Sequence, residues 1–114
     1  MQANVLLYPV EDIDQALPFF TEGLGLAVKF RDGNRYCALD AGALTLALVA
    51  GEERLVREPA LAFRVNAGED IGGALERLVR AGATVTRELE EGPHERRAVV
   101  ETPGGWSVVV SVKG

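Results

Sequence analysis

The sequence contains an internal repeat of about half its length. Residues 12–17, with the sequence DIDQAL, are matched by residues 70–75, with the sequence DIGGAL. A short apolar run precedes each segment, and a glycine (Gly25 or Gly82) follows each before a strand-like stretch. Modules of this size are too small to bury a core alone. We therefore expect the two modules to pack together, with the surface between them as the natural place for a ligand.

The composition is that of one globular domain. The chain has 114 residues, of which 47% are apolar and 25% charged. Its net charge is −5 and its 12 basic residues form no cluster, which argues against nucleic acid as a partner. No signal-peptide pattern or membrane-length apolar run occurs, so we expect no membrane partner and a cytoplasmic location. The single cysteine, Cys37, lies in an apolar strand context typical of a buried thiol.

The apolar patterning predicts the element order βαβββ twice, an α+β arrangement of two tandem modules. Module 1 covers about residues 1–50, a charged linker about 51–59, and module 2 about 60–114. One helix is expected from Asp14, its preferred N-cap, to about residue 24, because this places Pro18 near the end of the first turn. A second is expected from residue 69 or 70 to residue 81. The expected strands are 3–10, 26–31, 35–40, 43–49, 60–66, 84–90, 95–101 and 106–112.

The ordered motifs resemble one protein family over nearly the whole chain. They are Val10-Glu11-Asp12, the GLGL turn at 23–26, the AFRV strand at 62–65, the helix ALERLVRAG at 74–82 and the turn TPGGW at 102–106. This set closely resembles the vicinal oxygen chelate superfamily of glyoxalases, bleomycin resistance proteins and extradiol dioxygenases. The resemblance implies that the sheets of the two modules form a cup-shaped cavity.

The resemblance also implies a divalent metal in the cup of the enzymes, held by four His or Glu positions. In this sequence those positions fall on Val5, Ala47, Ala60 and Val109, which have no lone pair to donate. The only histidine, His94, follows a Gly-Pro turn, so two-histidine sites within the chain are excluded. We therefore expect no metal and no cofactor; a site built from His94, Glu95 and Glu101 is the alternative.

Strand alternation predicts which side chains face the cup. Among them, Arg64 could bind a ligand carboxylate or phenolate, or it could pair with Glu101 or Asp40, or lie in water at the rim. Tyr36 could stack on a planar ligand. Phe19, Phe20, Phe30 and Phe63 are expected in the core, and Trp106 as a structural plug. The candidate ligand-binding residues are Val5, Leu7, Tyr36, Ala38, Thr45, Ala47, Ala60, Ala62, Arg64, Val99, Glu101, Ser107 and Val109.

Three functions are compatible with these residues. The first is a metal-free binding protein, similar to bleomycin resistance proteins, that sequesters a small toxic or antibiotic compound in a crevice shared by two subunits. The second is a lyase, isomerase or dioxygenase-like enzyme that works without metal or with an atypical metal, using Glu101, Asp40 or Tyr36 as acid–base groups. The third is a structural subunit with a vestigial cup. We favour the first, with no catalytic residues and a homodimeric state.

Overall fold

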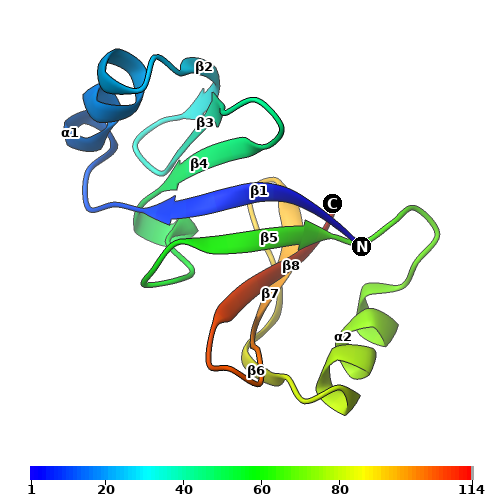
Figure 1. Cartoon of the computed structure of the whole chain (residues 1–114). Helices are drawn as coiled ribbons and strands as arrows, with labels where there is room; N and C mark the ends of the chain where they lie inside the picture. The colour runs from blue at the N-terminus through cyan, green and yellow to red at the C-terminus, as the bar shows by residue number, and fades with distance from the viewer. Residues whose placement is uncertain (114) are drawn as a thin grey trace. The chain divides into compact units, whose positions relative to one another are not determined.

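The computed structural model describes residues 1–113 and mixes strands with helices, as predicted (Figure 1). A π-helical turn, η1 (Phe19–Gly23), follows the first helix, and a 3-10 turn, η2 (Gly51–Glu53), follows the fourth strand. In the part of the chain that is described, no helix combines the length and apolar character needed to cross a membrane. The regular elements are β1 (Gln2–Pro9), α1 (Ile13–Pro18), β2 (Ala27–Asp32), β3 (Tyr36–Asp40), β4 (Thr45–Val49), β5 (Ala60–Arg64), α2 (Ile71–Arg80), β6 (Thr84–Glu91), β7 (Glu95–Glu101) and β8 (Ser107–Lys113).

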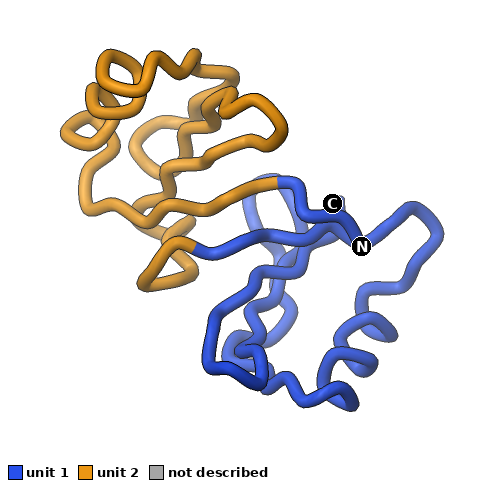
Figure 2. Tube along the Cα trace, in the orientation of Figure 1, with its two compact units in different colours: residues 1–4, 60–114 blue, residues 5–59 orange. Residues whose placement is uncertain are grey.

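The chain divides into two compact units, coloured separately in Figure 2. Of the described residues, 1–4 and 60–113 form unit 1, and residues 5–59 form unit 2. In unit 2 the strands lie in the order β2-β3-β4-β1, and in unit 1 in the order β5-β8-β7-β6. Each unit contains one parallel pair, β1 with β4 or β5 with β8, and its other neighbouring pairs are antiparallel.

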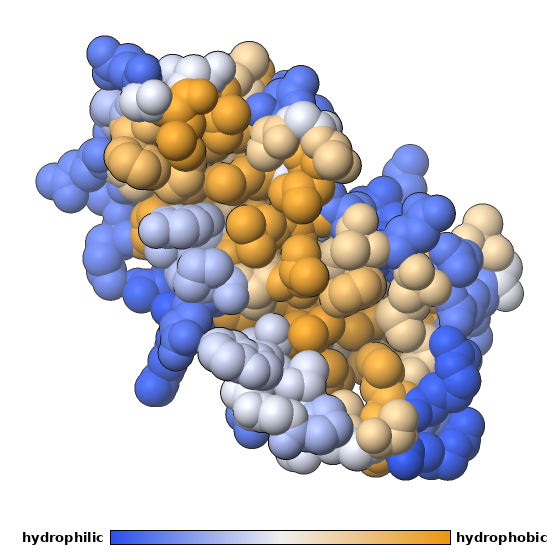
Figure 3. All heavy atoms as spheres, viewed as in Figure 1, coloured by the Kyte–Doolittle hydropathy of each residue, from blue (hydrophilic) through white to orange (hydrophobic). Residues whose placement is uncertain are grey.

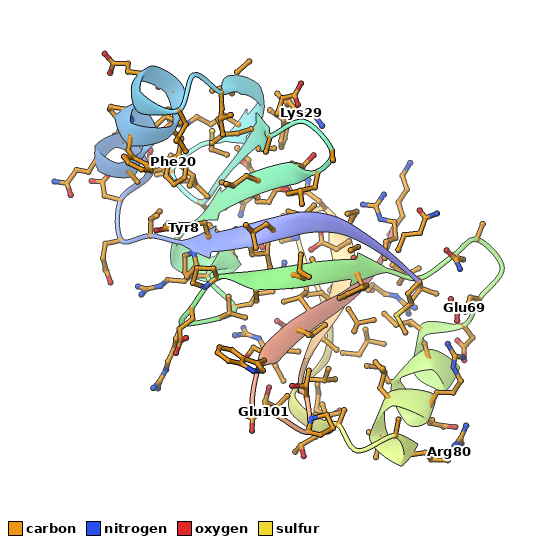
Figure 4. The ribbon with its side chains drawn as sticks, in the orientation of Figure 1. Tyr8, Phe20, Lys29, Glu69, Arg80 and Glu101 are labelled. Atoms are coloured by element: carbon orange, nitrogen blue, oxygen red, sulfur yellow. The ribbon has the colours of Figure 1, made fainter. Side chains whose placement is uncertain are left out.

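The core of unit 2 lies between α1 with η1 and one face of the sheet. Ile13 and Phe20 pack there against Leu39 and Leu48. The ring of Tyr8 meets that of Phe20 edge to face, with 5.3 Å between ring centroids, and both are labelled in Figure 4. Burial of Ile13 and Phe20 holds the short helix on the sheet.

The start of α1 differs from the expectation. Asp12, not Asp14, is its N-cap, and an Asp12 side-chain oxygen accepts a hydrogen bond from the Gln15 amide at 3.3 Å. Pro18 is the last α-helical residue. The chain then continues as the π-helical turn, in which the Leu24 amide donates a hydrogen bond to the Phe19 carbonyl. The missing N–H of proline favours this change of hydrogen bonding.

The core of unit 1 repeats this plan with α2. Asp70 caps the helix by accepting a hydrogen bond from the Gly73 amide at 2.9 Å. Ile71 and Ala74 are buried against Val100 and Val110 of the sheet. The second helix therefore lies where the sequence predicted it.

The segment predicted to be a charged linker, about residues 51–59, contains a short helical turn and buried side chains. Residues 51–53 form η2, and Glu53 and Val56 are buried. Sequence patterning missed this because a single 3-10 turn carries too few residues to show a period.

Candidate functional site

One face of the unit 2 sheet carries six of the residues expected to face the cup. The helix α1 packs on the other face, over Leu39 and Leu48. Residues directly opposite each other on neighbouring strands point to the same side of a sheet. The register pairs Val5 with Thr45, Leu7 with Ala47, Ala38 with Ala47, and Tyr36 with Val49. The structure therefore brings together on this face Val5, Leu7, Tyr36, Ala38, Thr45 and Ala47.

Burial divides these six residues into a floor and a margin. Leu7, Ala38 and Ala47 are buried, and they form the floor. Val5, Tyr36 and Thr45 are half-buried. A ligand would consequently meet the side chains at the margin first.

Phe30 belongs to this face, so the prediction that it lies in the core is wrong. A β-bulge between Val28 and Phe30 shifts the register, so Val28 pairs with Leu39 whereas Phe30 pairs with Ala38. The bulge turns Phe30 to the face of Tyr36, with 6.2 Å between the two ring centroids. Phe30 is 48% exposed. Simple alternation cannot reveal an inserted residue of this kind.

The opposite end of the same face is polar. The ammonium group of Lys29, which lies in the bulge and is labelled in Figure 4, donates a hydrogen bond to Thr45 Oγ1 at 2.9 Å. Asp40 is exposed, and its Oδ1 accepts from the Gly42 amide at 2.9 Å in the β3–β4 turn. Asp40 is therefore a turn-stabilising carboxylate, and Lys29 is a cationic group beside the candidate face.

The corresponding face of the unit 1 sheet carries the remaining candidates. The register pairs Ala62 with Val109, Val99 with Val109, and Glu101 with Ser107. Ala60, Ala62, Val99 and Val109 are buried and Ser107 is half-buried. Arg64 and Glu101 are exposed, and Figure 4 labels Glu101 at the end of its strand. Arg64 thus offers a solvated guanidinium instead of a buried anchor.

The buried arginine of this face is Arg97. Its side chain is only 4% exposed, and it pairs with Ser111, as Arg64 does, in the strand register. Its guanidinium lies 3.6 Å from Glu90 and 3.5 Å from Glu95. A buried cation needs partners of this kind to offset its lost hydration.

Gly92 leaves the space that the Arg97 guanidinium occupies. A Cβ atom added to Gly92 would meet Nη1 of Arg97, and it would lie 2.6 Å from Cζ and 2.8 Å from Nε. We expect Gly92→Ala to lower the free energy of unfolding by about 1–3 kcal/mol, the usual cost of overpacking. Chemical denaturation measures this change. Gly23→Ala is the control, because a Cβ there meets only Phe19 at 3.9 Å, and it should lose much less.

The residues present do not fit a divalent metal. The four positions that the family resemblance assigns to metal ligands are Val5, Ala47, Ala60 and Val109, whose side chains lack donor atoms. The alternative set also fails on geometry, because Glu95 and Glu101 are the two ends of β7, a span of roughly 20 Å. Within residues 1–113, no group of three or more His, Cys, Asp or Glu side chains has the arrangement of a metal site.

Cys37 is a buried structural residue, whereas two aromatic residues expected in the interior lie at the surface. Cys37 is fully buried, and desolvation by this burial raises the pKa of its thiol, which disfavours the nucleophilic thiolate. Trp106 is 68% exposed and Phe19 is 63% exposed, so the predictions of a structural plug at Trp106 and a core position for Phe19 are wrong.

Comparison with known proteins identifies the family. The model of the Glyoxalase/Bleomycin resistance protein/Dioxygenase superfamily matches residues 2–110. The chain belongs to this superfamily, which confirms the resemblance found in the sequence motifs. An uncharacterized protein of Mycolicibacterium smegmatis is 31% identical over 108 residues, covering 95% of this chain and 90% of the relative.

Solved structures share the fold at low sequence identity. A protein named NAD-dependent benzaldehyde dehydrogenase from Legionella pneumophila has a TM-score of 0.82 at 16% identity, covering 97% of this chain and 99% of that chain. Methylmalonyl-CoA epimerase from Mycobacterium tuberculosis has a TM-score of 0.72 at 21% identity, covering 99% and 88%. A superfamily member from Vibrio splendidus has a TM-score of 0.71 at 21% identity, covering 96% and 97%. Names this diverse do not select an activity.

Proposed function

We propose that this protein binds a small organic molecule without a metal ion and is not an enzyme. The observation that carries the proposal is the donor set: aliphatic side chains stand at all four positions that the family resemblance assigns to the metal. The two carboxylates considered for acid–base chemistry, Asp40 and Glu101, are both exposed. Since general acids and bases are usually tuned by burial, this exposure also favours binding over catalysis.

The candidate face of unit 2 supports a planar ligand with a polar or anionic substituent. Phe30 and Tyr36 form an aromatic pair at one end, and Lys29 with Thr45 supplies polar groups at the other. Between them, Ala38 and Ala47 form a floor of small residues. Tyr36 pairs with Val49, four residue steps along β4 from Thr45, so the two ends are roughly 13 Å apart, a length that accommodates a two-ring molecule.

We further propose that the protein is a cytoplasmic homodimer. The dimer sequesters a toxic or antibiotic compound in a crevice shared by its subunits. The superfamily includes bleomycin resistance proteins, which supports such a role. β2 is the last strand in the strand order of unit 2, and its Val28 and Phe30 side chains are 46% and 48% exposed. An edge strand with exposed apolar side chains favours association.

The aromatic pair provides the test of the ligand class. With 2-naphthoate and uncharged 2-naphthol as probes, we expect Phe30→Ala and Tyr36→Ala each to weaken binding about tenfold, because an aromatic contact contributes about 1 kcal/mol or slightly more. Lys29→Met should remove any preference for naphthoate over naphthol. Isothermal titration calorimetry measures these affinities.

The control is Phe19→Ala, an exposed phenylalanine whose ring contacts Phe20 on the helix side of the sheet. It should leave the affinity for both probes unchanged. Equal losses in Phe19→Ala and Phe30→Ala would contradict a binding role for this face.

A further inference from the structure

Unit 1 contains an apolar cavity on the side of its sheet opposite the candidate face. The cavity has a volume of about 430 Å³. Val100, Val108 and Val110 line it from β7 and β8, and Leu78 lines it from α2. Figure 3 shows apolar side chains, in orange, next to the hydrophilic outer side of α2. The cavity is therefore separate from the surface assigned to the proposed function.

The internal repeat explains why the cavity exists. In unit 2 the equivalent space between helix and sheet is filled, with Phe20 only 4% exposed. Five of the residues that line the cavity stand at positions matched, by strand register or by spacing from the start of the helix, to larger residues of unit 2. The pairs, with the residue of unit 2 first, are Leu39 and Val100, Leu46 and Val108, Leu48 and Val110, Leu26 and Ala83, and Phe20 and Leu78.

The walls of the cavity are held apart by other contacts. The N-terminal half of α2 is fixed by the Asp70 cap and by burial of Ile71 and Ala74. After the helix, Gly82 approaches the β7–β8 turn so closely that a Cβ atom there would lie 3.0 Å from Cγ of Pro103. These contacts fix both ends of the helix segment relative to the strands that line the cavity.

The lining defines the chemistry of an occupant. Its side chains carry no charge, and its one side-chain hydroxyl belongs to Thr102, whose oxygen accepts a hydrogen bond from the Trp106 amide at 3.1 Å. The volume lies within the range of roughly 300–1,000 Å³ typical of ligand pockets, and it exceeds the cavity of about 150 Å³ that accommodates benzene. We propose that this cavity is a second binding site, which takes an uncharged hydrocarbon group larger than a single ring.

The test uses the uncharged probe N-phenyl-1-naphthylamine and protein with ¹³C-labelled Leu and Val methyl groups. We expect saturable binding, with an increase in probe fluorescence and shifted methyl resonances for Leu78, Val100, Val108 and Val110. The matched methyl groups of Leu39 and Leu48 in unit 2 serve as the internal control and should not shift.

Ala83→Leu introduces the residue found at the matched position of unit 2. We expect it to weaken probe binding at least tenfold while the protein stays folded; if it does not fold, Val108→Leu replaces it. The control is Ala27→Leu, at an exposed position of unit 2, which should bind the probe as the wild type does. Absence of saturable binding, shifts confined to other methyl groups, or unchanged affinity in a folded cavity-filling variant would overturn the proposal.

Discussion

Replacing Leu48 by alanine is expected to lower the free energy of unfolding by about 2–5 kcal/mol. Leu48 is fully buried and packs in one cluster with Phe20 and Leu39. The substitution removes apolar contacts and leaves a void that close-packed neighbours cannot fill. Guanidinium denaturation followed by circular dichroism measures the change as a lower midpoint at constant slope.

The matched substitution in unit 1 is Val110→Ala. Val110 is equally buried, but it borders the cavity, so less packing is lost with its two methyl carbons. We expect a loss of about 1.5 kcal/mol, close to the transfer free energy of those carbons alone. A loss in Val110→Ala as large as in Leu48→Ala would contradict the description of the cavity.

Replacing Arg97 by alanine is the second change with a large expected effect, a loss of roughly 3 kcal/mol, as for breaking a buried ion pair. The side chain is 4% exposed and interacts with both Glu90 and Glu95. Alanine would leave Glu95 without this cation, while Glu90 would keep Arg87, and it would open a void on the candidate face. Thermal and chemical denaturation both report this loss.

Arg87→Ala is a matched control, because Arg87 binds the same Glu90 oxygen as Arg97. Its Nε lies 2.8 Å from that oxygen, closer than the 3.6 Å of Arg97, but its side chain is 45% exposed. An exposed ion pair contributes at most about 1 kcal/mol. If Arg87→Ala destabilises the protein as much as Arg97→Ala, burial does not determine the importance of the pair.

Much of the fold could be predicted from patterning because strands and the second helix have clear periods. The strand Glu95–Glu101 and the Asp70 cap of α2 lie where expected. The predicted N-cap of α1, Asp14, is wrong because the prediction gave more weight to the position of Pro18 than to the repeated Asp-Ile pair. The repeat carried the better signal, since Asp12 corresponds to Asp70.

The candidate faces could be predicted from alternation, but their important side chains could not. A β-bulge brings Phe30 beside Tyr36, and one inserted residue leaves no periodic signal. Burial of Arg97 depends on Gly92 and on strand pairing with β6 and β8, which are contacts between segments separated along the chain. Arg64 has the same pattern position on its strand but is exposed.

Native mass spectrometry of the protein purified without chelator tests the central claim, binding of an organic molecule without metal. It reports bound metal, retained small molecules and the oligomeric state in one spectrum. We predict a metal-free dimer that carries an organic adduct, whose mass would define the ligand. A dimer with stoichiometric divalent metal, lost on chelator treatment, would contradict this account.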